Sequence, residues 1–271
     1  MVVTVCLILR LNYSLERKEK RMRVKNVSII GYGFVGQAVH STLIESETCK
    51  ISIHDPYKKL YAQDYTSSDI IFLCLPTPFN GEIDISLISE YLDILTSNYY
   101  RGVVVIKSTV IYSKIAKYFD DLSIVINPEF LNQNTSFEDA KNQKCVLIGG
   151  DYMNAKKLID LYNDNSILKD ITYELCTAKE ASEFKYIRNI YGAYKVLFWE
   201  FVQNTTGNAR KMAELYHKMP YQSEMSQVSM DGYRGFGGAC FPKDVKAFDS
   251  HYLDKLTQFM LEYNYNLQNN K

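Results

Sequence analysis

The fold of this chain is decided by the stretch Gly31-Tyr32-Gly33-Phe34-Val35-Gly36. It directly follows the short apolar run Val27–Ile30 and precedes the helical segment Gln37–Ile44. A GxGxxG pattern between a strand and a helix is typical of a dinucleotide-binding turn, because the glycines permit the turn and free N–H groups at the helix start bind phosphate. The stretch therefore predicts a doubly wound α/β domain that binds a dinucleotide.

Each glycine has its own role in such a turn. Gly31 permits the tight turn, Gly33 lets the backbone approach a pyrophosphate, and Gly36 lets the helix pack on the strand. Asp55 ends the next apolar run, where its carboxylate can accept hydrogen bonds from a ribose diol and would repel a 2′-phosphate. We therefore expect NAD rather than NADP. The expected cofactor contacts in this region are Gly31, Gly33, Phe34, Val35, Gly36 and Asp55.

Composition limits the classes of function. The chain has 271 residues, a hydrophobic fraction of 46%, and 31 basic against 31 acidic side chains, so its formal net charge is zero. This composition excludes disorder as the overall state and gives no electrostatic basis for binding nucleic acid or an anionic membrane. The six cysteines form no CxxC pair, which favours free thiols in a reducing compartment. We expect a cytoplasmic protein without a bound metal.

Residues 1–21 are expected to be an appendage to the fold. The apolar run Val2–Leu11 is interrupted by Arg10 and precedes the charged run Glu16–Arg21, which reverses the order found in a secretory signal. No segment of the sequence reaches the length of a membrane span. Met22 is then the expected natural start, and a short amphipathic anchor is the alternative interpretation.

Short β-rich runs separated by helical or loop segments fill the first half of the chain. Continuous apolar runs that alternate with helices are typical of a parallel sheet covered on both faces. We therefore expect a doubly wound, Rossmann-like parallel sheet over residues 22–175, followed by a smaller all-helical domain over residues 176–271. The expected strands are Val27–Ile30, Ile51–Ile53, Ile70–Leu75, Val103–Ile106, Ile124–Ile126 and Cys145–Ile148.

The helical domain is expected to be built on one long helix. Apolar residues repeat at steps of three and four, which predicts an amphipathic helix over residues 178–202. Further helices are expected over residues 209–217 and 245–263, the second followed by a polar tail. We expect the long helix to form the core of a homodimer, because its apolar residues, which include Trp199 and Phe201, exceed what one small domain covers. Full burial within the chain is the alternative.

The densest chemical signal is the segment Gly235-Phe236-Gly237-Gly238-Ala239-Cys240-Phe241-Pro242-Lys243-Asp244. Glycines let a backbone pass close to a ligand and present N–H groups to a developing oxyanion. A cysteine among them is positioned as a nucleophile, and a Lys–Asp pair follows it. The alternative is a buried cysteine in a packed loop.

This segment and five others resemble those of the nucleotide-sugar 6-dehydrogenases, typified by UDP-glucose and GDP-mannose dehydrogenases. The resemblance implies NAD-dependent oxidation of a primary alcohol to a carboxylate in two hydride transfers. UDP-glucose is the first expected substrate, with UDP-glucuronate for polysaccharide biosynthesis as product. The other matching blocks are Gly31–Gly36, Cys74-Leu75-Pro76-Thr77-Pro78, Lys107-Ser108-Thr109-Val110, Asn127-Pro128-Glu129-Phe130-Leu131, and Glu183-Phe184-Lys185 with Asn189.

The resemblance also implies roles for individual residues. A water held by Asp244 and Lys185 would take the proton of the C6 hydroxyl, and Cys240 would trap the aldehyde as a thiohemiacetal. A second hydride transfer would leave a thioester, which water polarised by Glu129, with Thr109 nearby, would hydrolyse. The expected catalytic residues are Cys240, Lys185, Asn189, Asp244, Glu129 and Thr109.

Further contacts follow from the same resemblance. Lys185 and Asn189 are four residues apart, so they share one helix face and can stabilise an alkoxide and an oxyanion together. Additional cofactor contacts are expected at Thr77, Ser108 and Thr109. The expected substrate contacts are Phe130, Leu131, Lys185, Asn189, Phe236, Gly237 and Gly238.

Two features depart from the family pattern. Relatives usually carry a second glutamate four residues after the Glu129 position, where this chain has Gln133, which cannot accept a proton. Most relatives also continue into a third, nucleotide-binding domain, so we expect the nucleotide to be recognised elsewhere or weakly. Two alternatives stay open. One is a two-electron β-hydroxyacid-type dehydrogenase, which lacks the Cys240 segment, and the other is an inactive NAD-binding sensor or interaction protein.

Overall fold

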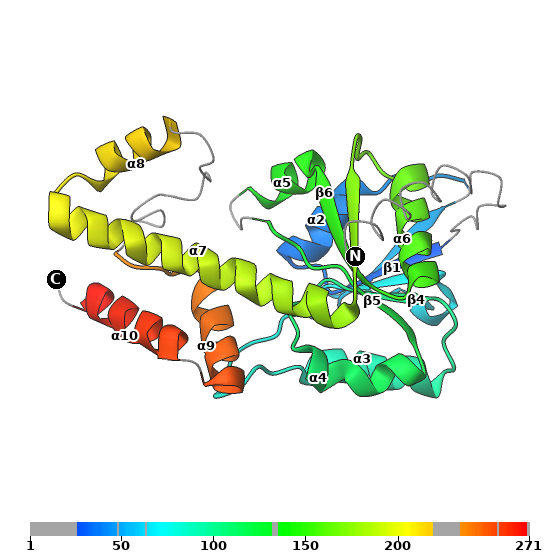
Figure 1. Cartoon of the computed structure of the whole chain (residues 1–271). Coiled ribbons are helices and arrows are strands. Elements are labelled where there is room, and N and C mark those ends of the chain that lie inside the picture. The colour runs from blue at the N-terminus through cyan, green and yellow to red at the C-terminus, as the bar shows by residue number, and fades with distance from the viewer. Residues whose placement is uncertain are drawn as a thin grey trace, which may run out of the picture.

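The computed structural model describes residues 26–47, 49–62, 64–131, 135–218, 234–253 and 255–269. The expected appendage over residues 1–21, Gln133 and the side chain of Phe201 lie outside the described part. Figure 1 shows a sheet covered by helices, from which one long helix leads to a group of helices at the other end of the molecule. In the described part of the chain, no helix is long and apolar enough to cross a membrane.

The sheet has seven strands in the order β2-β1-β3-β4-β5-β6-β7. The first five pair in parallel, whereas β6 runs antiparallel to β5 and pairs in parallel with β7. The predicted Rossmann-like sheet is thus confirmed, with two strands reversed. The strands are β1 (Asn26–Ile30), β2 (Lys50–His54), β3 (Ile70–Leu73), β4 (Val103–Ile106), β5 (Ser123–Ile126), β6 (Cys145–Gly150) and β7 (Thr172–Cys176).

Hydrophobic clusters cover both faces of the sheet. In β3, Ile70 and Phe72 point to one face and Ile71 and Leu73 to the other, and all four are fully buried. The first face packs against α2 and α6, and the second against α3, α4 and the start of α7. The bounds are α2 (Phe34–Thr42), α3 (Ser86–Ser97), α4 (Tyr112–Ile115), α5 (Ser136–Asn142), α6 (Tyr152–Asn165) and α7 (Ala178–Thr206), with short 3₁₀ helices at Pro56–Lys58, Tyr65–Ser67 and Ala116–Asp120.

The strand order reverses at β1. From β1 the chain first adds β2 on one side and then crosses to add β3 on the other. The loops that leave β1 and β3 therefore separate above the carboxyl edge of the sheet. In doubly wound sheets a ligand binds in the crevice at this switch point.

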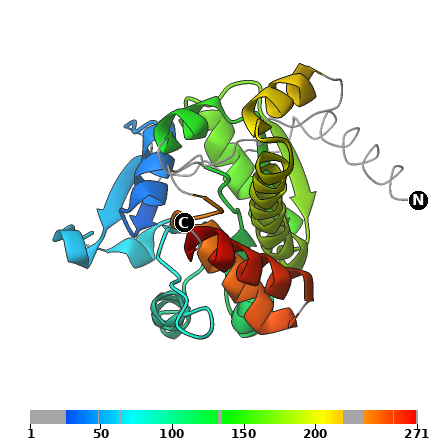
Figure 2. The ribbon, with the colours of Figure 1, turned by 90° about the vertical axis from the view of Figure 1, so that its left-hand side faces the viewer.

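The helical end contains two helices where the sequence predicted one. The predicted helix over residues 245–263, with a polar tail, is wrong, because Leu253 adopts a left-handed conformation (φ 51°) that ends α9. The following helix continues almost to the end of the chain, and the Thr257 hydroxyl ties it to the Asp249 carboxylate (2.8 Å). The helices are α8 (Ala209–Lys218), α9 (Phe241–Tyr252) and α10 (Lys255–Asn269), and Figure 2 shows α9 and α10 beside α7.

Helix α7 connects the sheet to the helical end. Its start packs on the sheet, and Trp199 near its far end is buried against Ala209 and Ala213 of α8. Trp199 is therefore covered within the chain and is unavailable as the dimer contact predicted from the sequence. An apolar stripe remains exposed, and it consists of Phe184, Ile187, Tyr191, Tyr194 and Phe198. The division at residues 175 and 176 stays a prediction.

The N-terminus of α7 is fixed by a capping box. The Thr177 hydroxyl accepts a hydrogen bond from the Glu180 backbone N–H (3.2 Å), and the Glu180 carboxylate accepts one from the Thr177 N–H (2.8 Å). This cap sets the first turn of the helix where the chain leaves β7.

We predict that Thr177→Ala lowers the free energy of unfolding by about 1 kcal/mol, because one backbone N–H loses its capping acceptor. Thr177→Ser is the matched control, since it keeps the hydroxyl, and it should change the free energy by only a few tenths of 1 kcal/mol. Urea unfolding followed by circular dichroism measures both. Equal midpoints for the two variants would contradict the capping role.

Candidate active site

The glycine turn after β1 has room for a side chain at Gly33 but not at Gly31 or Gly36. Gly31 has φ +86°, and a Cβ there would lie 2.6 Å from the Cys74 carbonyl oxygen. A Cβ on Gly36 would overlap the Gly31 carbonyl, whereas one on Gly33 would meet nothing within 4 Å. Gly33 is also exposed and caps the N-terminus of α2. This geometry fits a bound pyrophosphate. Phe34 and Val35 form the first helical turn beside it.

Asp55 faces this turn from the end of β2. Its carboxylate accepts hydrogen bonds from the backbone N–H groups of Tyr32 (2.7 Å) and Lys58 (3.2 Å). The Lys58 ammonium in turn donates to the Tyr32 carbonyl (2.6 Å). The carboxylate is therefore fixed beside the glycine turn, at the position expected for a ribose contact.

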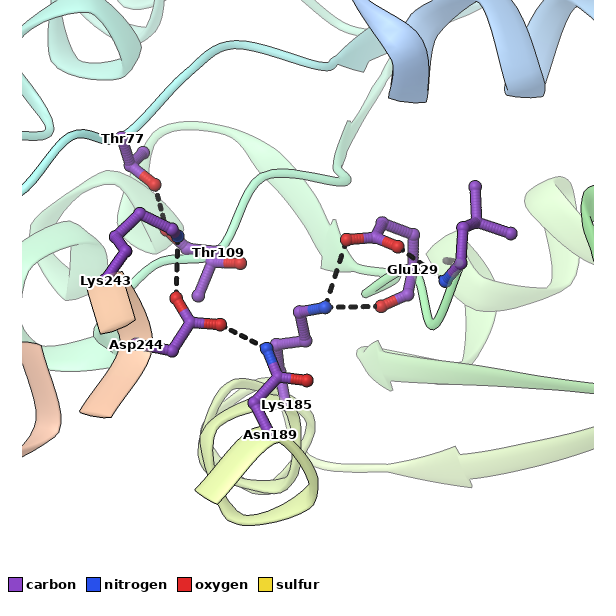
Figure 3. A network of polar contacts seen from close by, with 8 residues as sticks. Thr77, Thr109, Glu129, Lys185, Asn189, Lys243 and Asp244 are labelled. Carbon is purple, nitrogen blue, oxygen red and sulfur yellow. Dashed lines mark hydrogen bonds and ion pairs between the residues drawn. The ribbon is translucent and has the colours of Figure 1, made fainter. Parts of the chain in front are cut away.

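The loops after β3 and β4 are tied together next to the turn. The Thr77 hydroxyl donates to the Thr109 carbonyl (2.9 Å; Figure 3), and the Ser108 hydroxyl donates to the Leu75 carbonyl (2.7 Å). The Leu75 N–H donates back to Ser108 (2.9 Å). The predicted cofactor residues Thr77, Ser108 and Thr109 thus lie together at the carboxyl edge of the sheet.

A buried ion pair joins α7 to the loop after β5 (Figure 3). The Lys185 ammonium donates to the Glu129 carboxylate (3.0 Å) and to the Glu129 carbonyl (2.8 Å). The other carboxylate oxygen accepts a hydrogen bond from the Leu131 N–H (2.7 Å). Burial favours the neutral acid, but Lys185 and the Leu131 N–H outweigh it, so the pKa of Glu129 is lowered. Glu129 is therefore an ionised acceptor at neutral pH.

One turn further along α7, a second contact reaches α9. Asn189 donates a side-chain hydrogen bond to the Asp244 carboxylate, and the Lys243 ammonium contacts the other carboxylate oxygen (2.7 Å; Figure 3). Asp244 is fully buried. The shared helix face predicted for Lys185 and Asn189 is confirmed, and it holds Glu129 on one side and Asp244 on the other.

Cys240 lies immediately before α9, one helical turn from Asp244. Its carbonyl accepts the Asp244 backbone N–H (2.9 Å), and its thiol is free and partly buried. Burial raises the pKa of Cys240, although the Lys185 charge opposes this effect. The cysteine, the lysine and the two acids are thus brought together, with the resting thiol protonated.

The expected substrate contacts fall into two groups. Phe130 is half-buried, and its ring centroid lies 4.6 Å from the Arg188 guanidinium carbon and 5.8 Å from the centroid of the Phe184 ring. By contrast, the Phe236 side chain is buried in the core of the helical end. Gly237 is half-buried, and Gly238 is exposed with φ +73°.

Phe236 was expected to contact the substrate, but its side chain is in the core and both of its backbone polar groups hold the loop against α10. Its N–H donates to the Asn264 side chain (2.6 Å), and its carbonyl accepts from the Gln268 side chain (3.1 Å). No role was predicted for Asn264 and Gln268 of α10. None was predicted for Lys107 and Asn127 either, although each directly follows a buried strand.

Comparisons with known proteins show what the chain resembles. Residues 56–165 match the UDP-glucose/GDP-mannose dehydrogenase family, NAD binding domain. The UDP-glucose 6-dehydrogenase of Bacillus subtilis is 27% identical over 218 residues, which is 73% of this chain and 46% of that protein. The GDP-mannose 6-dehydrogenase of Azotobacter vinelandii is 27% identical over 211 residues, or 67% of this chain and 46% of that protein.

Two solved structures show the same fold. A UDP-glucose dehydrogenase from Pyrobaculum islandicum has a TM-score of 0.75 at 20% identity and matches 92% of this chain and 69% of its own. The 3-hydroxyisobutyrate dehydrogenase of Mycobacterium tuberculosis has a TM-score of 0.67 at 12% identity, and the match covers 90% of this chain and 95% of that protein.

The resemblance expected from the motif blocks is confirmed, and it includes the match of residues 56–165 to an NAD binding domain. The chain spans about half the length of the curated relatives it matches.

We predict that Gly33→Ala weakens NADH binding at least about tenfold, equal to about 1.4 kcal/mol, without destabilising the protein. The added methyl would fill only the space that a pyrophosphate approaches. Gly36→Ala is the matched comparison and should lower the free energy of unfolding by about 1–3 kcal/mol, because its methyl overlaps the turn. NADH fluorescence and urea unfolding measure the two effects. Unchanged NADH affinity in Gly33→Ala would contradict the assignment.

We also predict that NADH binds at least about tenfold more tightly than NADPH, a difference of about 1.4 kcal/mol. The fixed Asp55 carboxylate should repel the additional phosphate. Asp55→Asn keeps a hydrogen-bond acceptor but removes the negative charge, so it should reduce the preference for NADH over NADPH. Fluorescence titrations with both cofactors decide, and equal affinities in the parent protein would refute this role of Asp55.

Proposed function

We propose that this chain is an NAD-dependent dehydrogenase that oxidises the C6 alcohol of a nucleotide sugar to a carboxylate through a covalent intermediate on Cys240. UDP-glucose, giving UDP-glucuronate, is the first substrate to test. The observation that carries the proposal is the free Cys240 thiol, which lies close enough to Lys185, Glu129 and Asp244 for their charges to alter its pKa.

The cofactor would lie over the glycine turn, with its ribose at Asp55 and its phosphates at the start of α2. The open space at Gly33 fits this placement. Thr77 and Thr109, tied together beside the turn, would line the path toward the reacting carbon. When bound, NAD⁺ supplies the hydride acceptor for both oxidations.

In the first oxidation, the protein must take a proton from the C6 hydroxyl and stabilise the oxygen. Asp244 is fixed by Asn189 and Lys243, so its carboxylate can hold the water that receives the proton. Two of the three ammonium N–H groups of Lys185 contact Glu129, so the third can approach the substrate oxygen. Positive charge at that position favours the developing alkoxide.

Cys240 would then add to the aldehyde carbon. The thiol loses its proton as its sulfur forms the C–S bond, and the carbonyl oxygen takes up a proton to give a thiohemiacetal. The second oxidation converts this adduct into a thioester. A thiol suits both steps, because its adduct can donate a hydride and the thiolate is a stable leaving group.

Hydrolysis of the thioester is assigned to water oriented by Glu129. A carboxylate with a lowered pKa is ionised but is a weak base, so we assign it to orientation of the water. Both carboxylate oxygens already accept hydrogen bonds from Lys185 and Leu131. A water that Glu129 orients must therefore donate a second hydrogen bond to an oxygen that already accepts one from Lys185 or Leu131.

The remaining expectations belong to the same proposal. A homodimer through α7 is supported by its exposed apolar stripe from Phe184 to Phe198. A cytoplasmic location and a role in polysaccharide biosynthesis follow from the resemblance alone.

A two-electron dehydrogenase is the second candidate. The structural match to the Mycobacterium tuberculosis 3-hydroxyisobutyrate dehydrogenase covers 95% of that chain, so a protein with that name has the same two-part architecture. The position of Cys240 among Lys185, Glu129 and Asp244 favours the four-electron reaction, because a two-electron oxidation needs no covalent trap.

We predict two NADH for each sugar acid formed from UDP-glucose, with no free aldehyde and a sugar adduct on Cys240 visible by intact-mass spectrometry. Cys240→Ala should abolish acid formation and leave NADH binding unchanged. Cys145→Ala is the matched control, because Cys145 is an exposed free thiol, and it should keep the parent rate and stoichiometry.

Other outcomes separate the alternatives. One NADH per sugar, with full turnover in Cys240→Ala, would replace the proposal with the two-electron reaction. NADH binding without turnover of any UDP-sugar, GDP-sugar or sugar phosphate would favour the sensor or interaction protein.

A further inference from the structure

Three buried residues lie side by side at the carboxyl edge of the sheet, each at the end of one of three neighbouring strands. Cys74, Lys107 and Asn127 directly follow β3, β4 and β5, and all three are buried. The Lys107 ammonium donates to the Asn127 side-chain oxygen (3.0 Å), which also accepts the Tyr162 hydroxyl (3.0 Å). The Asn127 amide is held in turn by the Leu147 carbonyl (2.7 Å). A cation is thus fixed inside the protein.

A buried ammonium is costly unless an opposite charge compensates it. Burial lowers the pKa of Lys107 to about 8, with Lys185 acting in the same direction and Cys74 and Glu129 opposing. Burial also raises the pKa of Cys74 to about 12 and raises that of Tyr162, so both are neutral at neutral pH. Among these groups, Glu129 is the carboxylate that can balance Lys107.

Asn127 connects this cation to the candidate site. Asn127 lies two residues before Glu129 on the loop after β5, and its backbone N–H is fixed to the Ile106 carbonyl of β4 (3.0 Å). The Lys107 charge in turn lowers the pKa of Glu129. Glu129 is therefore influenced by cations from two sides, Lys185 and Arg188 on α7 and Lys107 at the sheet.

We propose that Lys107 is a positioning residue, a fixed buried countercharge that keeps Glu129 ionised and oriented while Lys185 contacts the substrate. This inference rests on the proposed function, in which Lys185 serves both Glu129 and the C6 oxygen. Lys185 keeps one ammonium N–H for new negative charge on the substrate. Lys107 instead donates to Asn127 and stays on the sheet side of Glu129.

The other charged groups of the site show what Lys107 adds. Glu129 and Asp244 are negative, and the sulfur of Cys240 is negative when it becomes a thiolate. Lys185, Arg188 and Lys243 supply positive charge from α7 and α9, and Lys107 supplies it from the sheet. Removal of the Lys107 charge takes away the cation on the sheet side of Glu129, which raises the pKa of Glu129 and shifts its ionisation to higher pH.

The first test compares Lys107→Met with Tyr162→Phe. The first removes the charge, whereas the second removes the other hydrogen bond to the same Asn127 oxygen and keeps the charge. Single turnovers with UDP-glucose, from about pH 5 to about pH 9, give the NADH burst by absorbance and the decay of the thioester by intact-mass spectrometry.

In Lys107→Met we expect the acid limb of thioester hydrolysis to move up by about one pH unit, with hydrolysis slowed about tenfold below it. The first NADH burst should stay within about threefold of the parent. Tyr162→Phe should keep the parent pH profile. Identical pH profiles for Lys107→Met and Tyr162→Phe would overturn the proposal and leave Lys107 a structural role only.

A second measurement needs neither turnover nor a Lys107 variant. In ligand-free protein labelled with ¹³C-glutamate, the Glu129 carboxyl resonance, assigned by its loss in Glu129→Gln, should show a second inflection near pH 8 as Lys107 loses its proton. The inflection should persist in Cys240→Ala, which removes the titrating thiol. Its absence would overturn the inference. Its presence without sugar oxidation would support the Lys107–Glu129 pair while refuting the proposed function.

Discussion

The buried ion pair between Lys185 and Glu129 is the contact that holds the candidate site together. It joins the loop after β5 to α7, and the same helix face carries Asn189 to the Asp244 carboxylate of α9. Removal of one partner from a buried ion pair commonly costs about 3–5 kcal/mol, because the other charge remains buried. Helix α7 is continuous from the sheet to the helical end, so it fixes the distance between the sheet edge and the Cys240 segment. The capping box at Thr177 sets where the helix begins.

Local patterns in the sequence were sufficient for most of the sheet. The six predicted strands are present, and most of them were marked by apolar runs that are buried in the sheet, whereas β2 is a half-buried edge strand. Strand β7 was missed because it lies at the sheet edge, where most of its side chains are exposed and no apolar run forms. The break at Leu253 was also missed, since a leucine in a left-handed conformation has no characteristic sequence pattern.

The candidate site was predictable in its members and less so in its pairings. The motif blocks named Glu129, Lys185, Asn189 and Asp244, but only the packing of α7 between the sheet and α9 shows which acid meets which partner. Phe236 was expected at the substrate from the family resemblance, yet it is buried in the core, where the Asn264 side chain of α10 accepts a hydrogen bond from its N–H. Burial likewise has the largest effect on the pKa of Cys240, which Lys185 and Lys243 lower and Glu129 and Asp244 raise.

The protonated resting state of Cys240 has a consequence for the chemical durability of the protein. Peroxides and alkylating agents react with the thiolate, and oxidation beyond the sulfenic acid is in general irreversible. A thiol whose pKa is raised by burial reacts slowly with them, even though its sulfur is partly accessible. Under the proposed function, the same burial would therefore also protect the sulfur from these reagents between turnovers.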